Sequence, residues 1–430
     1  MTICDEAAAG ELLRSLFDAA LAAADPDRAL AGHIPVPVPG RTLLLGAGKA
    51  AAAMARAFES RWLGPLEGIV LTRYGHAVSC DRVVVVEASH PVPDAAGERA
   101  ARQMLALAHS LGPDDQLVFL ASGGGSALLT LPAPSLTLAD KQAVTHALLR
   151  SGATIAEINA VRKHISAIKG GRLAAAAAPA HILTLAISDV PGDDPAVIAS
   201  GPTVPDPTTF ADARAVLAKY GISGPAAVMA HLALELEETP KPDDPIFART
   251  RFALIASPQG SLDAAAAVAL RRNITPIVLS DRIEGEARDV ALVHAAIAQQ
   301  IRSGEFRVGD RIVYPPAVLL SGGETTVTIK GPGRGGRNVE FLLALAVALD
   351  GVAGISALAC DTDGIDGTED NAGAILYADS IARAAARGIR APAALAGNDG
   401  CGFFDALGDL VVTGPTLTNV NDFRAILVLA

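Results

Sequence analysis

Cysteine is scarce in this sequence, with only four among 430 residues. Cys4, Cys80, Cys360 and Cys401 lie far apart and form no C-x-x-C pair, so the spacing argues against a zinc site or a disulfide framework. This cysteine usage is typical of a reducing compartment, and we expect a cytoplasmic location.

Positive charge is also in short supply. Lysine and arginine together number 35 against 46 aspartate and glutamate residues, which gives a formal net charge of -11. A surface that coats nucleic acid needs a basic face, so the composition argues against a nucleic-acid partner. It does not argue against small anionic substrates, because a local cluster of basic side chains can still bind them.

A long apolar run is missing as well. The longest strongly apolar helical stretch, Phe341–Leu349, is short and lies between two acidic residues. A membrane-spanning helix needs about 20 apolar residues, so the sequence predicts no membrane span. The sequence also lacks a G-x-S-x-G elbow, which argues against a serine hydrolase, and a Walker A loop.

The sequence does have length and hydrophobic residues. Half of its residues are hydrophobic and only 19% are charged, so we expect a sizeable core and no disorder. Single cores stop growing at about 250–300 residues, which predicts two domains for this length. Residues 235–244 are dense in Glu, Asp, Pro and Lys and are typical of an exposed linker, so we place the domains at 1–240 and 241–430.

Short apolar runs alternate with alanine-rich helical stretches. The runs are continuous, as expected for strands that are covered on both faces. We expect strands at 43–45, 69–71, 83–86, 117–120, 182–187, 252–256, 276–279, 317–320, 325–329 and 355–359, and helices near 50–62, 94–109, 137–150, 154–166, 209–219, 260–272 and 287–302. The pattern predicts two α/β domains, with a mostly parallel, Rossmann-like sheet in the N-terminal domain, a smaller C-terminal domain and the active site in the cleft.

Two glycine-rich loops follow predicted strands of the first domain. Gly46, Gly48 and Lys49 follow the first strand, where backbone amides, a helix dipole and a full charge could meet an anion. A tight strand–helix turn is the alternative. The run Ser122–Ser126 contains three successive glycines whose amides could wrap a phosphate, and a flexible connector is its alternative.

Two more loops carry charged groups. Asp189, after the strand at 182–187, could hold a metal or accept a hydroxyl proton, although Asp, Pro and Gly are also ordinary turn residues. Arg334 and Arg337 stand among glycines in the segment 331–338, where two guanidinium groups could clamp a carboxylate or phosphate. A loop with solvated arginines is the alternative for this segment.

An acidic loop follows the strand at 355–359. Its carboxylates Asp361, Asp363 and Asp366 repel one another unless a cation or arginines neutralise them, and a hard metal is the simplest partner. A solvated acidic turn is the alternative, and the spacing does not fit an EF-hand. His90 and His164 have no spacing that singles them out, so we expect them to be core or surface residues.

Taken together, these segments resemble the class II glycerate kinase family. The resemblance runs from about residue 43 to 422, and the region at about 315–425 is similar to the family's C-terminal domain. One departure is Leu417, where the family pattern has a glycine. The segments that carry the resemblance are Gly46–Ala50, Ser122–Ser126, Arg162–Arg172, Ile187–Asp194, Ser200–Thr203, Ser321–Glu324, Gly335–Glu340, Asp361–Gly367 and Thr413–Asp422.

The resemblance implies ATP-dependent phosphorylation of D-glycerate to 2-phosphoglycerate with a divalent metal. It matches Lys49 and Arg337 to the basic residues that are central to the family's catalysis. Because phosphoryl transfer needs positioning and charge neutralisation, we expect Asp189 to orient or deprotonate the attacking hydroxyl and the three acids of residues 361–366 to hold Mg²⁺. We assign nucleotide binding to Gly46, Gly48, Ser122, Gly123, Gly124, Gly125, Ser126, Gly322, Gly323, Glu324, Arg334, Asn338 and Asn421.

Two alternatives remain. An NAD(P)-dependent hydroxypyruvate reductase would use the dinucleotide pattern of two glycine loops, but a Rossmann site needs an acid where the second strand here ends at Thr72 and Arg73. A non-catalytic anion-binding protein would not need such a density of charged groups in the loops. Among partners we expect a small-molecule substrate and neither nucleic acid nor membrane, and the sequence leaves the oligomeric state open, a homodimer included.

Overall fold

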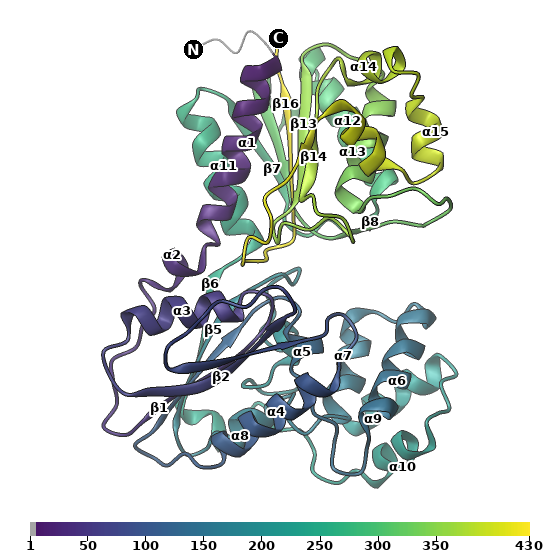
Figure 1. Ribbon diagram of the computed structural model, residues 1–430. Coiled ribbons are helices and arrows are strands. Elements are labelled where there is room, and N and C mark those ends of the chain that lie inside the picture. Colours follow the sequence, from purple (N-terminus) through teal and green to yellow (C-terminus); the bar gives the residue numbers. More distant parts are fainter. Residues whose placement is uncertain (1–5) are drawn as a thin grey trace. The chain divides into compact units, whose positions relative to one another are not determined.

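The computed structural model describes residues 6–430, which form two compact units. One unit comprises Pro26–Ile255, and the other comprises residues 6–25 together with Ala256–Ala430. Both are α/β structures, as the sequence predicts (Figure 1). The thiols of Cys80, Cys360 and Cys401 are free, and Cys4 lies outside the described residues.

The N-terminal unit is built on one six-stranded sheet. The sheet has the strand order β3-β2-β1-β4-β5-β6, and its first five strands pair in parallel. This is the Rossmann order, so the predicted Rossmann-like sheet is confirmed. The strands are β1 (Thr42–Ala47), β2 (Leu66–Arg73), β3 (Val83–Ala88), β4 (Gln116–Ala121), β5 (His181–Ile187) and β6 (Thr250–Ala256).

Helices cover this sheet and also form a separate helical layer. The core between β1, β2, β4 and α4 contains Leu43, Ile69 and Phe119, while α6, α7, α9 and α10 pack around Val144, Ile158 and other apolar residues. The helices are α2 (Pro26–Leu30), α3 (Ala51–Arg61), α4 (Ala95–Ala108), α5 (Gly125–Leu128), α6 (Leu138–Ser151), α7 (Ile155–His164), α8 (Arg172–Ala177), α9 (Phe210–Lys219) and α10 (Ala226–Leu234), with 3₁₀ turns at Ile198–Ser200 and Pro245–Arg249.

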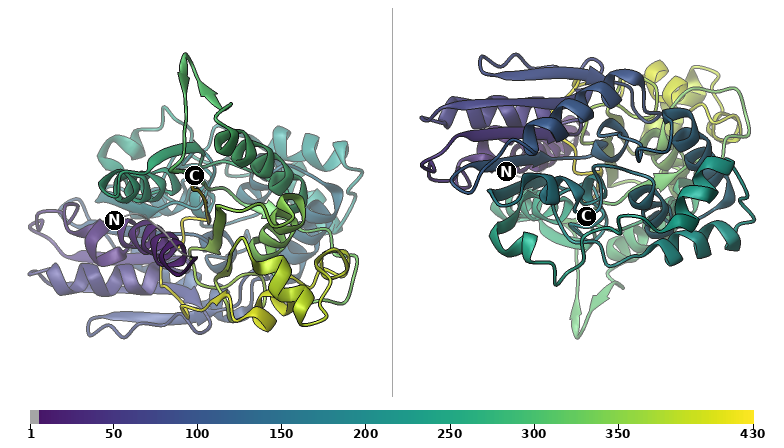
Figure 2. Two further views of the ribbon diagram at one scale, coloured as in Figure 1. Left: turned by 90° about the horizontal axis from the view of Figure 1, so that it is seen from above. Right: turned by 90° about the horizontal axis from the view of Figure 1, so that it is seen from below.

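The C-terminal unit contains a mixed sheet of order β15-β14-β13-β16-β11-β7, in which β11 and β7 are parallel and the other neighbouring strands are antiparallel. The hairpin of β9 and β10 projects from the body of this unit (Figure 2). The strands are β7 (Thr275–Ser280), β8 (Gly285–Glu286), β9 (Arg307–Val308), β10 (Arg311–Ile312), β11 (Ala317–Ser321), β12 (Thr325–Thr326), β13 (Ile355–Asp361), β14 (Gly373–Leu376), β15 (Leu410–Val411) and β16 (Asp422–Val428).

Two helical layers enclose this mixed sheet (Figure 1). One side packs on α1 and α11 through Phe17, Leu320 and Phe423, and the other packs on α12 and α13 through Phe341 and Ile426. Alternate residues of each strand therefore face different helices. The helices are α1 (Glu6–Ala23), α11 (Pro258–Arg271), α12 (Ala287–Ser303), α13 (Arg337–Leu349), α14 (Ser380–Ala386), α15 (Ala391–Ala396) and α16 (Gly400–Leu407).

The division into units differs from the one expected at residue 240. Helix α1 belongs to the C-terminal unit, and β6 extends the sheet of the N-terminal unit. The segment expected to be an exposed linker, 235–244, has six exposed residues among its ten, so the expected exposure is largely confirmed. It lies inside the N-terminal unit rather than between the units. Thr239 is buried, and Glu238 accepts a hydrogen bond from the backbone N–H of Phe210 at 3.0 Å, which ties the segment to this unit.

The strand expected at 325–329 is shorter than predicted. Only Thr325 and Thr326 form a strand, which pairs with β8. No helix within residues 6–430 combines the length and the apolar composition that crossing a membrane requires.

Candidate active site

The strand order of the N-terminal unit defines where a ligand should bind. β1 and β4 are neighbours in the sheet. The strands β2 and β3, which follow β1 in the chain, lie on one side of this pair, and β5 and β6, which follow β4, lie on the other side. In open α/β sheets, ligands bind outside the carboxyl ends of the strands at such a switch point. The loops that follow β1 and β4 contain Lys49 and Ser122–Ser126, so the sheet brings the first two predicted loops together.

Hydrogen bonds join these two loops. The backbone N–H of Lys49 donates to the carbonyl oxygen of Gly123 at 2.7 Å, and the N–H of Ala50 donates to Ser122 Oγ at 3.0 Å. Gly48 has a φ of +143°, and a Cβ there would come within 2.1 Å of Ser122 Oγ. Glycine is required at this close approach, so the two loops form one structural site.

Gly124 brings two further side chains to the site. Its φ is +79°, and a Cβ at this position would lie 3.1 Å from His90 Cδ2 and 3.4 Å from Lys49 Cγ. His90, for which the sequence suggests no role, therefore flanks the loop beside Lys49. The N–H groups of Gly123 and Gly124 donate to no acceptor within residues 6–430, so both are available to an oxyanion.

The segment after β5 adds a strained turn to this edge. Asp189 is half-buried two residues beyond β5, which pairs in parallel with β4. Ala199 and Ser200 have φ values of 52° and 61°, which non-glycine residues adopt only at a cost in free energy. Ser200 Oγ lies 2.6 Å from Ser126 Oγ and donates to Asn159 Oδ1 at 3.1 Å, which fixes both serine hydroxyls.

A second group of predicted residues surrounds Arg337 in the C-terminal unit. Arg337 is the first residue of α13, and three carboxylates hold its guanidinium group. Its Nε donates to Asp422 at 2.8 Å, its Nη2 donates to Asp361 at 2.8 Å, and its Nη1 lies 3.2 Å from Glu324. Burial opposes the charge, but these acids outweigh it and raise the pKa of Arg337.

Asp366 serves the same helix. Its two carboxylate oxygens accept the backbone N–H groups of Asn338 and Val339, each at 3.0 Å, so the carboxylate caps the N-terminus of α13. Burial raises the pKa of Asp366 to about 6, although these two amides lower it. Asp366 was expected to be a metal ligand, whereas the contacts of the structure give it a structural role.

The other two acids of this loop are also engaged. Asp361 accepts the N–H of Asp363 at 3.0 Å besides its bond to Arg337, and Asp363 accepts the N–H of Ile365 at 2.9 Å. Residues 6–430 contain no group of three His, Cys, Asp or Glu side chains arranged to hold a metal ion. An arginine and backbone amides already neutralise these carboxylates, and metal binding by Asp361, Asp363 and Asp366 stays a prediction.

A second arginine in this unit escaped the sequence analysis. Arg424 on β16 is completely buried and forms an ion pair with Asp422, which thus lies between two arginines. Its Nη2 also donates to Thr325 Oγ1 at 3.1 Å, and its guanidinium lies 5.3 Å from the ring centre of Phe341. The signal in the sequence was one arginine in a strand that is otherwise apolar after its first residue, Asp422.

The remaining predicted residues of this unit divide into two groups. Gly322 donates its N–H to the carbonyl oxygen of Ser280 at 2.8 Å, and the carbonyl oxygen of its neighbour Gly323 accepts the N–H of Asp422, so both glycines pack beside the acid–arginine cluster. The buried Asn421 directly precedes Asp422 and accepts the N–H of Thr362. Arg334 differs: its side chain is 57% exposed and pairs with Glu369, so the expected two-arginine clamp is not formed.

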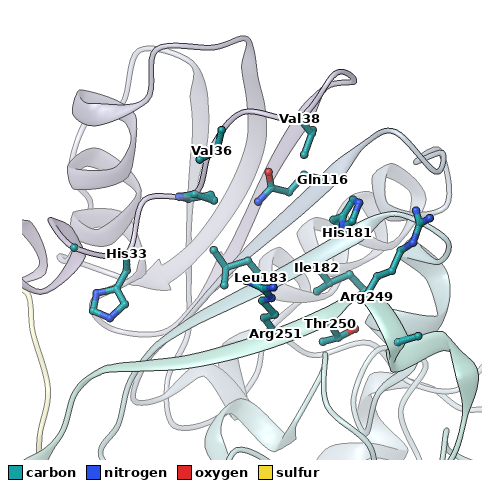
Figure 3. Close-up of a pocket in the computed structure, with 13 residues that line it drawn as sticks. His33, Val36, Val38, Gln116, His181, Ile182, Leu183, Arg249, Thr250 and Arg251 are labelled. Atoms are coloured by element: carbon teal, nitrogen blue, oxygen red, sulfur yellow. The ribbon is translucent and has the colours of Figure 1, made fainter.

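Two cavities lie in very different places. A pocket of about 250 Å³ opens at the start of α13 and is lined by Arg337 and neighbouring glycines. A larger cavity of about 530 Å³ is lined by Gln116, His181 and Thr250, the first residues of β4, β5 and β6 (Figure 3). It lies at the amino ends of these strands, opposite the glycine loops, and none of the predicted site residues lines it.

The chain matches two protein families and several known proteins. Residues 12–233 match a family described as a domain of unknown function, DUF4147, and residues 317–422 match the MOFRL family. The chain is 40% identical to a D-glycerate 2-kinase of Thermotoga maritima, with 92% of this chain and 93% of that protein covered. It is also 53% identical to an Agrobacterium vitis protein that carries the provisional name hydroxypyruvate reductase, with 99% and 95% covered.

The fold agrees with these similarities. The crystal structure of a glycerate kinase from Thermotoga maritima matches with a TM-score of 0.88 and 37% identity, and covers 98% of this chain and 100% of that one. The loops after β1 and β4 lie within the residues matched by DUF4147. The cluster around Arg337 lies within the residues matched by the MOFRL family.

Proposed function

Because the chain belongs to the class II glycerate kinase family, we propose that it transfers the terminal phosphoryl group of ATP to D-glycerate and releases 2-phosphoglycerate. The family assignment rests on a family match over more than half of the chain and on relatives that are 40% identical over most of it. The choice of ATP as donor and of the 2-hydroxyl as acceptor is the part that needs an experiment.

The joined loops after β1 and β4 are the observation that carries this proposal. A lysine and two amides that donate to no acceptor in the described part of the chain meet at the switch point of the sheet. Phosphoryl transfer requires positioning and neutralisation of charge on the phosphate oxygens, and little covalent chemistry from the protein. Lys49 supplies the charge, and the N–H groups of Gly123 and Gly124 supply fixed hydrogen-bond donors.

Asp189 and Arg337 complete the proposed machinery. Asp189 accepts the proton of the attacking hydroxyl or orients that hydroxyl, which a half-buried carboxylate at a strand end can do. Arg337 binds an anionic group through Nη1, because Glu324, its partner on that side, is 52% exposed and is the easiest of the three acids to displace.

Magnesium fits this arrangement as a companion of the nucleotide. The acids expected to bind it are occupied by Arg337 and by backbone amides, so the described residues offer no ready-made cage. Mg²⁺ commonly reaches kinase sites with substrate phosphates and few protein ligands. When bound, it would neutralise charge on the phosphate oxygens, and Asp361 or Asp363 would be the residues to reach it directly or through water.

The proposal is tested by measuring ADP with and without D-glycerate. Purified protein with ATP and Mg²⁺ should release ADP at a rate that depends on D-glycerate, and chromatography should separate ADP from ATP. ADP release that is independent of any hydroxy acid would contradict the proposal.

The reductase alternative is tested in the same preparation. The Agrobacterium relative is the observation in its favour, whereas β2 ends at Arg73 rather than at the acid that binds the 2′-hydroxyl of the adenosine ribose of NAD. Absorbance of NADH should stay constant when the protein and hydroxypyruvate are mixed with it. Steady oxidation of NADH, without D-glycerate-dependent ADP release, would replace the kinase with a reductase.

A further inference from the structure

Three basic side chains gather beneath the Ser122–Ser126 loop. Lys141 lies on α6, Arg162 lies on α7, and Lys169 precedes α8. Lys141 is 4% exposed, Lys169 is fully buried and Arg162 is half-buried, so the group reaches the surface at the arginine. Burying several positive charges in one place costs free energy unless negative charge or hydrogen-bond acceptors compensate them.

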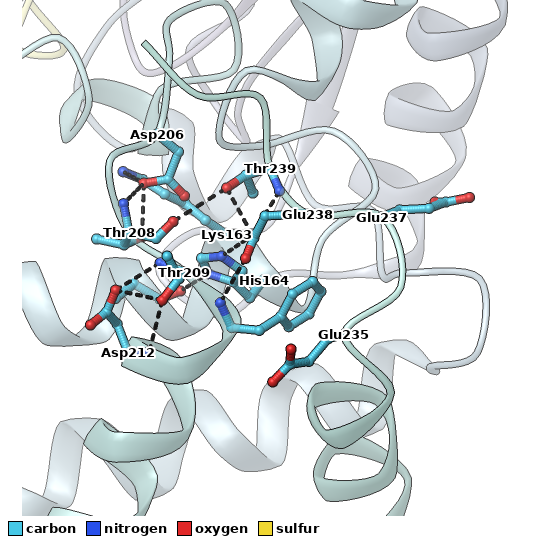
Figure 4. Close-up of polar contacts among 12 residues, drawn as sticks. Lys163, His164, Asp206, Thr208, Thr209, Asp212, Glu235, Glu237, Glu238 and Thr239 are labelled. Carbon is cyan, nitrogen blue, oxygen red and sulfur yellow. Dashed lines mark hydrogen bonds and ion pairs between the residues drawn. The ribbon is translucent and has the colours of Figure 1, made fainter. Parts of the chain in front are cut away.

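A neighbouring lysine shows how this unit usually compensates such a charge. Lys163 is as buried as Lys141, and its Nζ donates to the buried carboxylate of Asp206 at 3.2 Å. The adjacent His164 contacts Glu238 at 2.8 Å in the same way (Figure 4). Each buried basic group of this pair therefore has its own acid.

Lys141 has no such partner. Its buried Nζ makes no hydrogen bond, and Arg162 forms no ion pair or side-chain hydrogen bond within residues 6–430. The negative charge of Glu98 raises the pKa of Lys141 slightly, but the carboxylate of Glu98 accepts a hydrogen bond from Arg102 at 2.7 Å. The buried Nζ of Lys141 therefore has no compensating acceptor within residues 6–430.

Lys169 connects this group to the glycine loop. Its Nζ donates to the carbonyl oxygen of Ser126 at 2.7 Å and lies 3.5 Å from that of Ala199. On α7, Asn159 precedes Arg162 by three residues and therefore shares its helix face. Asn159 accepts the hydroxyl of Ser200, so the basic residues and the serine pair belong to one contiguous region.

The pKa shifts of the lysines also indicate that these positive charges lie close together. Burial, with a smaller contribution from repulsion by Arg162, lowers the pKa of Lys141 to about 7. Burial also lowers the pKa of Lys169, with repulsion from Lys141 and Arg162 added. The three side chains are thus close enough to repel one another, and a bound anion would restore the charged state of Lys141.

We propose that Lys141 and Arg162, with Lys169 behind them, form an oxyanion site that holds a carboxylate or phosphate group beside Ser126 and Ser200. In the kinase proposed above, on which the identity of the ligand rests, this group is the carboxylate of the hydroxy acid. A fixed carboxylate would orient the hydroxyl that is phosphorylated and would discriminate against neutral alcohols.

The test measures binding without turnover. Lys141→Met keeps the apolar stem and removes the ammonium group, and isothermal titration with D-glycerate alone, ATP alone and inorganic phosphate alone gives three affinities. The affinity for D-glycerate should fall about 10- to 100-fold while that for ATP changes less than about 2-fold, since a hydrogen bond to a charged group is worth about 1.5–3 kcal/mol. A loss confined to ATP and phosphate would keep the oxyanion site and assign it to the nucleotide.

Lys219→Met is the matched control, because Lys219 is an exposed lysine of the same unit, and all three affinities should remain unchanged. Arg162→Gln is the second variant in case Lys141→Met does not fold, and it should show the same selective loss. Unchanged affinities in both variants, or a wild-type protein that binds none of the three ligands, would overturn the oxyanion site. Binding that responds as expected in a protein without kinase activity would reject the kinase and keep the site.

Discussion

Individual charged residues in the C-terminal unit stabilise one another in a chain of alternating sign. Asp422 lies between Arg337 and Arg424, and Asp361 binds the far side of Arg337. Such buried pairs contribute little net stability, but removal of one member leaves an uncompensated charge. The function proposed for Arg337 therefore depends on residues that never touch the substrate.

Replacing the central acid should reveal this dependence. Asp422→Asn leaves the buried Arg424 without its acid, and the free energy of unfolding of the C-terminal unit should fall by about 3–5 kcal/mol. Urea denaturation followed by circular dichroism measures the change. Arg334→Gln is the control, because its pair with Glu369 is exposed and should contribute less than about 1 kcal/mol. Equal effects of the two substitutions would contradict this account of the cluster.

Lys49 is the residue on which the proposed chemistry depends most. Lys49→Met should lower kcat by about 10²–10³-fold, which is the range for losing one preorganised electrostatic contact to a transition state. The thermal unfolding temperature should hardly change, because the methionine keeps the aliphatic stem. Lys219→Met should retain the wild-type kcat. Normal turnover in Lys49→Met would exclude this lysine from phosphoryl transfer.

Single residues also show where sequence reasoning succeeds. The loops around Gly48 and Gly124 were predicted because glycine-rich loops after strands can present backbone amides to an anion. The structure places these two loops together. Leu417, which replaces the glycine of the family pattern, has a φ of 62° and so keeps a glycine-like backbone at some cost in strain. Lys141 and Arg424 were missed, because one sequence does not show which charged side chains will be buried.

At the scale of elements, helix ends were predicted better than partnerships between elements. Thr137 with Asp140 and Thr154 with Glu157 form reciprocal capping boxes at the starts of α6 and α7, as their sequence pattern indicates. No local sequence pattern indicates the cap at the N-terminus of α13. Its cap is Asp366, which lies 29 residues after Arg337 and reaches the helix only through the fold.

Helix α12 carries a histidine that should make stability depend on pH. Burial lowers the pKa of His294 to about 4, and the ring contacts Ser321 Oγ at 3.0 Å. The folded state thus binds this proton less readily than the unfolded state, whose histidine pKa is about 6.5. The stability that the neutral ring of His294 contributes is fully present above pH 6.5. It should be lost as the pH falls toward 4, by up to about 3 kcal/mol.

His294→Phe provides the comparison, because phenylalanine retains a ring against Phe341 and cannot titrate. In urea denaturation, the unfolding free energy of the wild type minus that of this variant should fall as the pH drops from 6.5 to 4. A difference that stays constant over this range would show that His294 is not the titrating group.

At the scale of the whole molecule, the chain order and the folding units do not coincide. The first described helix, α1, completes the core of the C-terminal unit, where Phe17 packs 5.7 Å from Phe423 between ring centres. Composition located a break near residue 240, but no local signal shows that α1 packs against strands more than 300 residues later. Contacts of this kind are set by the tertiary structure alone.

Phe17→Ala should therefore weaken the far end of the sequence. The substitution removes a fully buried ring, which costs about 3–5 kcal/mol, and hydrogen exchange measured by mass spectrometry should accelerate in β16 and α11. Exchange in β1 and β4 should stay as in the wild type, because they belong to the other unit. Faster exchange in β1 and β4 alone would contradict the division into units.

The central claim is that this protein phosphorylates D-glycerate at its 2-hydroxyl with ATP as donor. Phosphorus NMR of the product formed from ATP, Mg²⁺ and D-glycerate tests it directly, because coupling of the phosphorus to one methine proton identifies 2-phosphoglycerate. We predict a single new phosphomonoester doublet that grows as ADP forms. A triplet from a phosphate on the terminal CH₂ group would contradict the assigned hydroxyl, and the absence of a new phosphomonoester signal would contradict the kinase.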